Sequence, residues 1–479
     1  VHSGEYHDRW WLYPYQLWLA ERSVHAAILG ALRDDERHTG HARAILLGYA
    51  DRYLEYPNRD NVLGPSRLFF STYLESLWLL HICIAADALH AGGDVATADI
   101  VRDRIVQPAV ELIETYDEGM SNRQAWNSAA IVAARTFLSE RVSAPSVEFA
   151  LTGIETLLHH AVGADGNWYE GNNYHQFAHR GLWYGITLGE RAGHAFDPEL
   201  VARFDAGFRA PFISALPDFT YPARKDSRYA ASLRQWMFAE SCELGLARHD
   251  DPVLAWALAR MYADDIPPGD TGRARSSGEA ERHAPPVRLS RADLGWRSLL
   301  FARASLPPPG DAYPGSVTVE SQGLTIHRRQ QGDVYVALDW GQGGGGHGHP
   351  DCLNLLFSHG ATRWLDDLGT GSYVDPSLHW YRSTLAHNAP LVDGRSQARV
   401  NGECIGLGAE AGFEFVSARA YGLAPGVRVE RTVVTADRYF IDEVRWEAED
   451  VVQFDLPVHF DAACDDVTFA PGALEGGKD

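Results

Sequence analysis

Cysteine, long apolar runs and positive charge are all scarce in this chain. Its five cysteines, at positions 83, 242, 352, 404 and 464, include no CxxC pair, so neither a disulfide framework nor a zinc ribbon is indicated. It has no run of about 18 apolar residues, so no transmembrane helix is predicted. The formal net charge of −22 argues against nucleic acid or an anionic membrane as a partner. A local arginine cluster is still compatible with a small anionic substrate.

The remaining composition is that of a globular protein. The 479 residues are 45% hydrophobic and 22% charged, enough for two or three domains. Fourteen Trp and twenty Tyr form a high aromatic load, which suits both carbohydrate clefts and helical cores. The chain begins at Val1 rather than Met, so a leader or a longer N-terminal region is compatible with it, and the compartment stays open.

Amphipathic helices are predicted over roughly Trp10 to Tyr262. Apolar residues recur three and four positions apart, and Gly, Pro, Asp or Asn separate the periodic segments. Three long helices are predicted within 9–32, 41–56 and 67–90, and further helices near Thr97, Asn122, Ser146, Asn172, Pro198, Ser227 and Pro252. Helical hairpins without a fixed sequence repeat favour an α/α toroid or a bundle.

The texture changes in the second half. Ile266–Pro286 is rich in Pro, Gly, Ser and charge and is predicted to be a mobile linker or surface loop, followed by one short helix near ADLGWRSLLFARASL. From about Ser316, alternating and β-branched runs predict an antiparallel sandwich. The predicted fold is therefore α+β and multidomain: helices over 1–265, a linker and short helix over 266–315, and a sandwich over 316–479, with further strands expected beyond the end.

The first chemistry-bearing cluster is DGNWYEGNNYHQFAHRG, residues 165–181. At helical spacing, Asn172, His175, Gln176 and His179 lie near one another along a face. Imidazole and amide groups beside aromatic rings suit a pocket that binds a sugar and moves a proton. The competing interpretation is a buried layer of hydrogen-bonded histidines.

The second cluster is GQGGGGHGHPDCLN, residues 341–354. His347 and His349 share one face if the segment is extended, and Asp367 and His387 follow on later strands. Two imidazoles and a carboxylate make a plausible zinc-type site, although an H-x-H pair alone is a weak signal and an Asp such as Asp367 often only caps a turn.

The third cluster is YPARKDSRYAASLRQW, residues 221–236. Arg224, Lys225, Arg228 and Arg234 are predicted to surround Tyr229, which would favour its phenolate and create an anion-binding patch. The competing interpretation is a solvated basic helix start capped by Asp226 or Ser227.

These motifs resemble the heparinase II/III-type polysaccharide lyases, including the oligoalginate lyases. The resemblance runs from about Arg67 to Gly394 and rests on GNWYEGNNYHQFAHRG, DSRYA, GGHGHPDCLN, LDDLGTGSY and YRSTLAHNAPLVDG. It implies an α/α toroid, incomplete here, joined to an antiparallel β-sandwich.

Site roles follow from the same resemblance. His175 matches the toroid histidine, with His179 as the alternative, Tyr229 the catalytic tyrosine, and His347 the sandwich histidine of the cleft. His349, Asp367 and His387 match the ligands of a structural metal ion, usually zinc. Substrate-binding candidates are Asn172, Asn173, Gln124, Asn127, Arg67, Arg180, Arg228 and His179. Tyr174 rather than Asn directly precedes His175.

The activity implied is β-elimination on a 4-linked uronate polymer of the heparin/heparan or alginate type, with either Tyr229 or His175 as base. The alternatives are a glycoside hydrolase that uses a carboxylate pair such as Glu170 and Asp226, a non-catalytic uronate-binding protein, and a zinc hydrolase. Neither the polymer, nor endo or exo action, nor the oligomeric state follows from the sequence.

Overall fold

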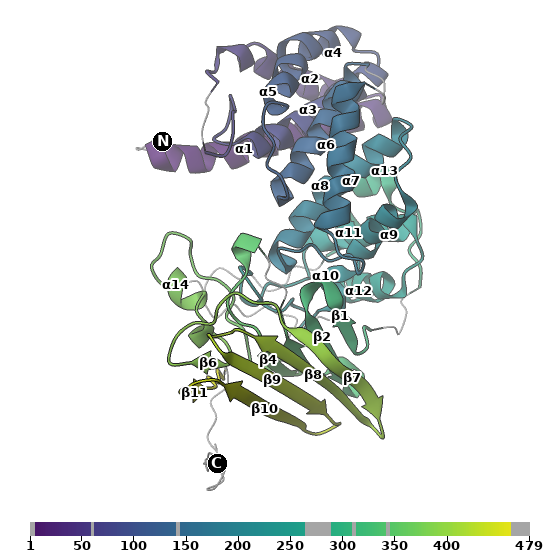
Figure 1. Ribbon diagram of the computed structural model, residues 1–479. Helices are drawn as coiled ribbons and strands as arrows, with labels where there is room; N and C mark the ends of the chain where they lie inside the picture. Colours follow the sequence, from purple (N-terminus) through teal and green to yellow (C-terminus); the bar gives the residue numbers. More distant parts are fainter. Residues whose placement is uncertain are drawn as a thin grey trace. The chain divides into compact units, whose positions relative to one another are not determined.

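The computed structural model describes residues 5–58, 62–139, 144–263, 289–308, 313–341 and 345–460, with side chains from residue 12 onward (Figure 1). The chain forms two compact units. The helical unit gathers Val1–Ile213, Leu233–Asp264 and Val287–Ala312, and the sheet unit gathers Ser214–Ser232 and Tyr313–Asp479. The predicted linker Ile266–Pro286 lies outside the described residues.

The predicted fold class is confirmed, because a helical region precedes antiparallel sheets. The helices of the first unit are α1 Glu5–Arg33, α2 Glu36–Ala50, α3 Thr72–Ala91, α4 Val95–Val101, α5 Gln107–Ile113, α6 Asn122–Phe137, α7 Pro145–His160, α8 Asn172–Arg191, α9 Pro198–Gly207, α10 Ala210–Ile213, α11 Trp236–Arg248, α12 Pro252–Tyr262 and α13 Trp296–Phe301. Aspartates start several of them: Asp35, Asp94 and Asp251 accept hydrogen bonds from backbone N–H groups of the first turn.

Helix α3 is the centre of the helical unit. It packs against α1 and α6, and Trp78, Leu79 and Ile82 on it are fully buried. By length and composition α3 is apolar enough to cross a membrane, which the search for an unbroken apolar run missed, but 67% of its most apolar window is buried inside the unit. That burial is typical of a core helix in a helical domain.

The prediction that a helix begins near Ser227 is wrong. Residues 222–235 are irregular, and α11 begins only at Trp236. Lys225 and Ala230 have φ angles of 59° and 51°, in the left-handed region that non-glycine residues rarely occupy. The tertiary contacts of this segment, described below, therefore override its helical pattern.

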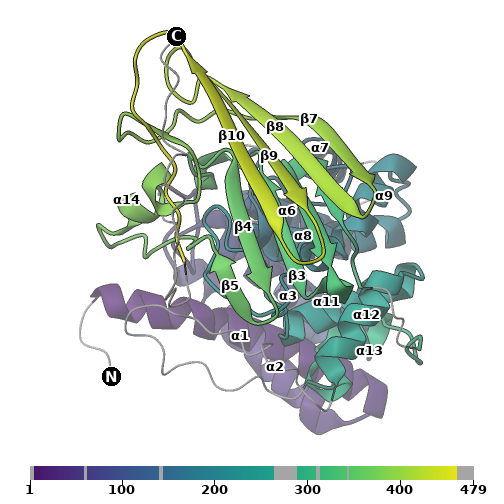
Figure 2. The same cartoon turned by 90° about the horizontal axis from the view of Figure 1, so that it is seen from below.

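The sheet unit is built from two antiparallel sheets. The first has the order β1-β2-β3-β4-β5 and the second β10-β9-β8-β7, whose four strands lie side by side in Figure 2. Their bounds are β1 Val317–Val319, β2 Leu324–Arg329, β3 Val334–Asp339, β4 Asn354–His359, β5 Thr362–Leu365, β7 Glu403–Glu410, β8 Phe413–Tyr421, β9 Val427–Thr435 and β10 Phe440–Ala448. A small pair joins β6, Leu391–Val392, to β11, Phe454–Asp455.

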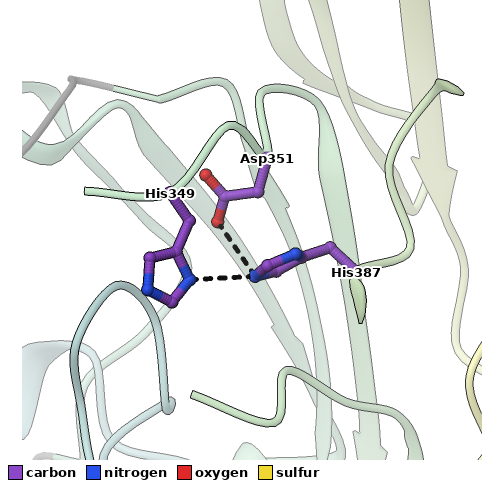
Figure 3. Close-up of side chains that lie close together, drawn as sticks. All are labelled: His349, Asp351 and His387. Atoms are coloured by element: carbon purple, nitrogen blue, oxygen red, sulfur yellow. Dashed lines mark hydrogen bonds and ion pairs between the residues drawn. The ribbon is translucent and has the colours of Figure 1, made fainter. Parts of the chain in front are cut away.

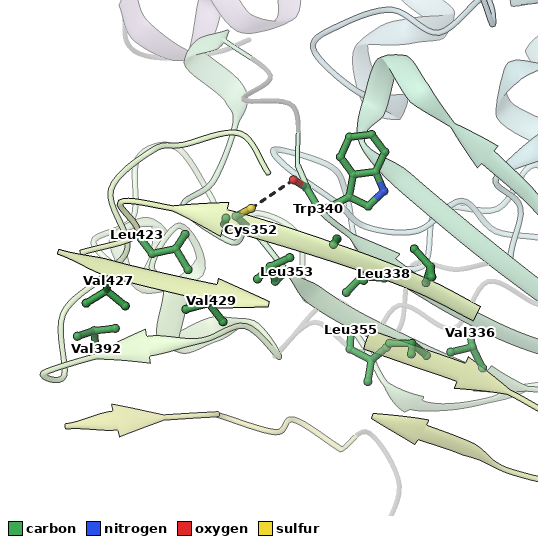
Figure 4. Packing of buried hydrophobic residues seen from close by; sticks show 14 of the residues in the cluster. Val336, Leu338, Trp340, Cys352, Leu353, Leu355, Val392, Leu423, Val427 and Val429 are labelled. Carbon is green, nitrogen blue, oxygen red and sulfur yellow. Dashed lines mark hydrogen bonds between the residues drawn. The ribbon is translucent and has the colours of Figure 1, made fainter. Parts of the chain in front are cut away.

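The two sheets share one apolar core (Figure 4). Val336 and Leu338 of β3 and Leu355 of β4 pack with Val429 and Val433 of β9, and all five are at least 98% buried. Because side chains alternate along a strand, only one face of each sheet supplies this core.

The opposite face of the first sheet is polar but equally buried. Arg328, Tyr335, Ser358 and Arg363 occupy successive register positions across β2, β3, β4 and β5. Residues 214–232 cover this face: Arg328 donates to the Ala215 carbonyl at 3.0 Å, and Tyr335 donates to the Ser214 carbonyl at 3.4 Å. This explains why β3 is buried along its whole length.

Strand β7 was missed in the sequence. Its ECIGLGAE run contains Gly406 and Gly408, which weaken strand propensity. In the fold, the Phe415 ring of β8 lies over Gly408, where a Cβ would collide with it. An aromatic neighbour therefore replaces the side chain that the glycine lacks.

One buried ion pair ties the sandwich together and gives a test of the fold. Arg431 of β9 bonds both oxygens of Asp442 at 2.8 and 2.7 Å and the Leu353 and Asn388 carbonyls at 2.7 and 2.6 Å. We expect Arg431→Met to lower the free energy of unfolding by about 3 kcal/mol, because a carboxylate and two carbonyls lose their donor. Urea denaturation measures this. The matched change Arg445→Met, at an exposed pair with Glu443, should cost less than about 0.5 kcal/mol.

Candidate active site and metal site

The segment 222–230 carries the candidate chemistry of the sheet unit. Its two left-handed residues, Lys225 and Ala230, bracket Asp226 and Tyr229. Thr370 donates its backbone N–H to the Ser227 carbonyl at 3.0 Å. Gly369, with φ +68°, packs so closely that a Cβ there would collide with this same carbonyl. Strained backbone of this kind persists only where its surroundings hold it in place.

Asp226 is the hub of the site. Its fully buried carboxylate accepts from His347 Nδ1 at 2.8 Å, His349 Nε2 at 3.1 Å, Tyr373 Oη at 3.0 Å and Arg382 Nε at 2.9 Å, and from a second Arg382 nitrogen. Burial alone would raise the pKa of Asp226, but the bonds from both histidines, Arg382 and Tyr373 outweigh it and hold the pKa far below its usual range. Asp226 therefore stays ionised.

His347 is fixed at two points. Its Nδ1 meets Asp226, and its carbonyl accepts the Asp226 backbone N–H at 3.0 Å. Because an ionised carboxylate only accepts hydrogen bonds, Nδ1 of His347 carries a proton and donates it to Asp226. The segment is not extended as predicted, since Gly345–His347 form a 3-10 turn. His347 and His349 nevertheless bond different oxygens of the Asp226 carboxylate.

His349, Asp351 and His387 point toward one another and form a buried cluster that suits a metal ion (Figure 3). His349 Nδ1 and His387 Nε2 are 3.2 Å apart, and Asp351 Oδ2 lies 3.7 Å from His387 Nε2. Two nitrogens bound tetrahedrally to zinc lie about 3.3 Å apart. Asp351 Oδ2 is buried without a hydrogen-bond partner among the described residues, as expected for an atom that binds a cation.

The outer nitrogens of both histidines are already engaged. His349 donates Nε2–H to Asp226, and His387 donates Nδ1–H to the Ser383 carbonyl at 2.8 Å. These bonds leave the two lone pairs, on His349 Nδ1 and His387 Nε2, facing each other. Carboxylate or carbonyl partners that fix the ligand tautomer in this way are typical of metal-binding histidines.

Asp367 lies beside the cluster, and Asp351 is the member that the sequence prediction omitted. Asp367 Oδ1 lies 3.6 Å from His387 Nε2 and also accepts from the Gly369 N–H at 2.9 Å. Burial raises the pKa of Asp367 to about 6, despite the opposing effect of His387. The H-x-H-x-D spacing contained the signal for Asp351. The group whose possible ligand atoms all lie within 4.8 Å of one another is His349, Asp351 and His387, and Asp367 lies next to it.

Three of the four basic residues predicted to surround Tyr229 have other partners. Arg224 bonds both oxygens of Asp339, Lys225 donates to Gln322 Oε1 at 3.0 Å, and Arg234 donates to the Met261 carbonyl within the helical unit. The cation that meets Tyr229 is Arg363 of β5, 5.0 Å from the ring centroid. Charge runs in the sequence did not reveal it, because Arg363 lies more than 130 residues away in the chain.

A buried ion network holds Arg363 in place. Asp218 accepts from Arg363 Nε at 3.0 Å and from a terminal nitrogen at 2.6 Å, while Asp366 accepts from the other terminal nitrogen at 3.2 Å. Burial raises the pKa of Asp366, although Arg363 and a hydrogen bond from Tyr229 oppose this. Asp366 thus positions the Tyr229 hydroxyl and Arg363 positions its ring, and both of these residues are held by the ion network.

His175 and His179 lie in the helical unit, on α8, and are buried. His175 accepts the Trp168 N–H at Nδ1, 3.2 Å, and donates Nε2–H to the Gly207 carbonyl at 2.8 Å. His179 donates Nε2–H to the Phe204 carbonyl at 2.9 Å. Burial lowers the pKa of His175 to about 4 and that of His179 to about 3. In this arrangement both ring nitrogens of His175 are occupied by backbone groups.

The other predicted contact residues are spread over both units. Asn172 and Asn173 begin α8 and are half-buried, and Arg228 is exposed. Gln124 and Asn127 are buried and bond one another, with Ser76 donating to Asn127 Oδ1 at 2.8 Å. Arg67 donates to the Tyr56 carbonyl and lies 5.9 Å from the Tyr53 ring. Arg180 faces Glu21 and Trp236.

The chain is similar to one family of known proteins in its C-terminal part and to two curated proteins over most of its length. Residues 314–471 match the family described as Heparinase II/III-like, C-terminal. An exo-oligoalginate lyase of Saccharophagus degradans is 24% identical, with 93% of this chain and 63% of that protein aligned. An alginate lyase of Stenotrophomonas maltophilia is 24% identical over 91% of this chain and 61% of its own length. The chain thus spans less than two thirds of these curated relatives.

Solved structures agree on the fold. A heparinase III gene product superimposes with a TM-score of 0.62 at 13% identity, over 94% of this chain and 66% of that one. Heparan sulfate lyase HepC from Pedobacter heparinus gives 0.60 at 14% identity, over 89% of this chain and 61% of that one. The fold is that of the heparinase III-type polysaccharide lyases. Residues 314–471 match the Heparinase II/III-like family, and the resemblance predicted from the motifs is confirmed.

The metal cluster makes a prediction about stability. Saturating Zn²⁺ should raise the thermal midpoint of the sheet unit, because a ligand present at 1,000 times its Kd stabilises the folded state by about 4 kcal/mol. His387→Ala should abolish this shift. His327, a buried histidine that bonds Thr435 Oγ1 at 2.9 Å, provides the control. His327→Gln should lower stability but keep the zinc-dependent shift; an unchanged shift in His387→Ala would exclude the cluster as the binding site.

A second prediction concerns Asp226. Asp226→Asn keeps the shape but removes the charge and replaces one acceptor oxygen with a donor, so His349 and Arg382 lose a matched partner. We expect metal affinity to fall 10- to 100-fold, as is typical when such an outer partner of a ligand is lost. Competition with a chromogenic chelator measures this. Asp442→Asn, which removes the carboxylate partner of Arg431, should reduce stability without changing metal affinity. Equal affinities in the parent and Asp226→Asn would contradict the role assigned to Asp226.

Proposed function

We propose that this chain is the catalytic part of a polysaccharide lyase that cleaves a 4-linked uronate chain by β-elimination. The observation that carries the proposal is the segment 222–230, which presents the phenol of Tyr229 and, three residues earlier, the carboxylate that orients His347. A phenol and an oriented imidazole are the general acid–base groups that such an elimination needs.

Tyr229 is the proposed proton carrier. As a phenolate it removes the proton from C5 of the uronate; the C5 electrons form the C4=C5 double bond as the C4–O4 bond breaks. The proton returns from the Tyr229 phenol to the departing O4. Arg363, 5.0 Å from the ring, stabilises the negative charge of the phenolate. We assign the base to Tyr229 rather than His175, since the imidazole of His175 is bonded to backbone on both sides.

His347 is the proposed electrophilic partner. Removing the C5 proton places negative charge beside the substrate carboxylate, so a donor must first neutralise that carboxylate. The Asp226 carboxylate stabilises a protonated His347, in the way that a buried aspartate supports a catalytic histidine. The contributions of His175, Asn172, Asn173 and the remaining predicted contact residues stay predictions.

The metal is proposed to be zinc with a structural role. Two imidazoles and a carboxylate suit Zn²⁺, a second carboxylate lies beside them, and β-elimination needs no activated water. A bound ion would link the segment of His349 and Asp351 to His387. The residues themselves do the rest: His349 holds Asp226 through Nε2, and Asp226 holds His347.

Alginate oligosaccharides are the proposed substrate class. Both curated relatives are named as alginate lyases, whereas the heparinase matches are alike in fold at 13–14% identity. A glycoside hydrolase is less consistent with the site. Asp226 is ionised by five bonds and cannot serve as a general acid, and Glu170 is buried with bonds from Trp168 Nε1 and Asn122 Nδ2.

The test is the appearance of an unsaturated uronate, followed by its ultraviolet absorbance, on a panel of alginate and glycosaminoglycan oligomers. A hydrolase would cut without new absorbance, and a binding protein would yield no product. Tyr229→Phe should lower kcat by about 100- to 10,000-fold with little change in KM, because only proton transfer is lost.

Tyr221→Phe is the matched control, since this buried tyrosine lies in the same covering segment. It should keep kcat close to that of the parent. Substantial turnover in Tyr229→Phe would remove Tyr229 from the mechanism, and absorbance-free cleavage would replace elimination with hydrolysis.

A further inference from the structure

Helix α1 exposes a row of large apolar side chains on the helical unit. Leu12, Tyr15 and Trp18 are 54%, 55% and 52% exposed, and Arg22 follows one turn later on the same face. The Tyr15 and Trp18 rings stack at 6.0 Å with 25° between their planes. Exposed stacked aromatics carry a cost in water and mark a binding surface when they occur with directed polar groups.

Directed polar groups are present beside Trp18. The Arg22 guanidinium lies 5.8 Å from the Trp18 ring centroid. In the same unit, Arg180 lies 5.5 Å from the ring of Trp236, which is 38% exposed. Two half-exposed indoles therefore each carry a guanidinium group.

Glu21 joins the two pairs. One of its oxygens lies 3.2 Å from Arg22 and the other 3.9 Å from Arg180. The Nε atoms of Arg22 and Arg180 are both buried without a hydrogen-bond partner among the described residues.

The charge balance favours an anion. Arg180 also interacts with Glu240, which is paired with the buried Arg297. Three guanidinium groups thus face two carboxylates, an excess of one positive charge in a chain whose net charge is −22. Planar guanidinium groups bind carboxylates in a bidentate fashion, and indole faces bind the C–H faces of pyranose rings.

We propose that this tryptophan–arginine surface, Trp18, Glu21, Arg22, Arg180 and Trp236, is a subsite for one uronate residue of an oligosaccharide. The pyranose ring stacks on an indole, and its carboxylate pairs with the partly exposed guanidinium group of Arg22. The proposal rests on the lyase function above, because it names where a second sugar of the same substrate is held, but it concerns binding alone.

The experiment measures binding separately from turnover. In the Tyr229→Phe background, calorimetry with alginate tetrasaccharides should show that Trp18→Ala and Arg22→Gln each weaken binding about five- to tenfold, equivalent to about 1–1.4 kcal/mol. Arg180→Lys, which keeps the charge but loses the planar fork, should weaken binding to a smaller extent. A neutral glucose tetrasaccharide should bind much more weakly than the uronate in the parent.

The matched control is Trp446→Ala on β10, a 50%-exposed tryptophan stacked on Phe454 outside this surface, which should leave affinity unchanged. Parent-like affinity in Trp18→Ala and Arg22→Gln, with unsaturated product still formed by the wild type, would overturn the subsite and leave the lyase intact. Equal binding of the neutral sugar would also overturn it. Loss of affinity in both variants without any product from the wild type would retain the subsite and reject the lyase.

Discussion

The carboxylate of Asp226 is the constraint on which the sheet unit depends. One oxygen is bonded to a histidine that faces the metal cluster, and the other to the histidine proposed for catalysis. A tyrosine and an arginine complete its shell. Because the bonds to Asp226 come from two other parts of the chain, residues 347–349 and residues 373–382, a shift in either part alters the geometry of the other.

This arrangement explains why a strained loop is stable. The left-handed backbone at Lys225 and Ala230 is offset by the buried ion pairs of Arg224 and Arg363 and by the close packing of Gly369. The polar face of the first sheet is therefore a rigid support rather than a second apolar core. Precise positioning of reacting groups requires such support from neighbours that are themselves fixed.

Local patterns in the sequence predicted much of this structure. Helical periodicity located α6, α8, α9 and α12 at their first residues, and alternation located most strands. Two of the predicted metal ligands, His349 and His387, lie together in the buried group, whereas its carboxylate, Asp351, was not predicted. What failed was decided by distant contacts: the helix expected at Ser227 is overridden by Asp226 and its partners, and β7 is stabilised by Phe415 lying over a glycine. Arg363 reaches Tyr229 across the sheet, a pairing that no local pattern contains.

The placement of residues 214–232 determines how the chain can be divided into fragments. Although they lie between helices in the sequence, they belong to the sheet unit, where they cover the row of Arg328, Tyr335 and Arg363. A fragment that begins near residue 316, at the apparent helix-to-strand transition, would expose that row to water. It would also separate Tyr229 from Arg363. A chimera that exchanges the sandwich with that of another protein must therefore also exchange residues 214–232, because the two form one packed unit.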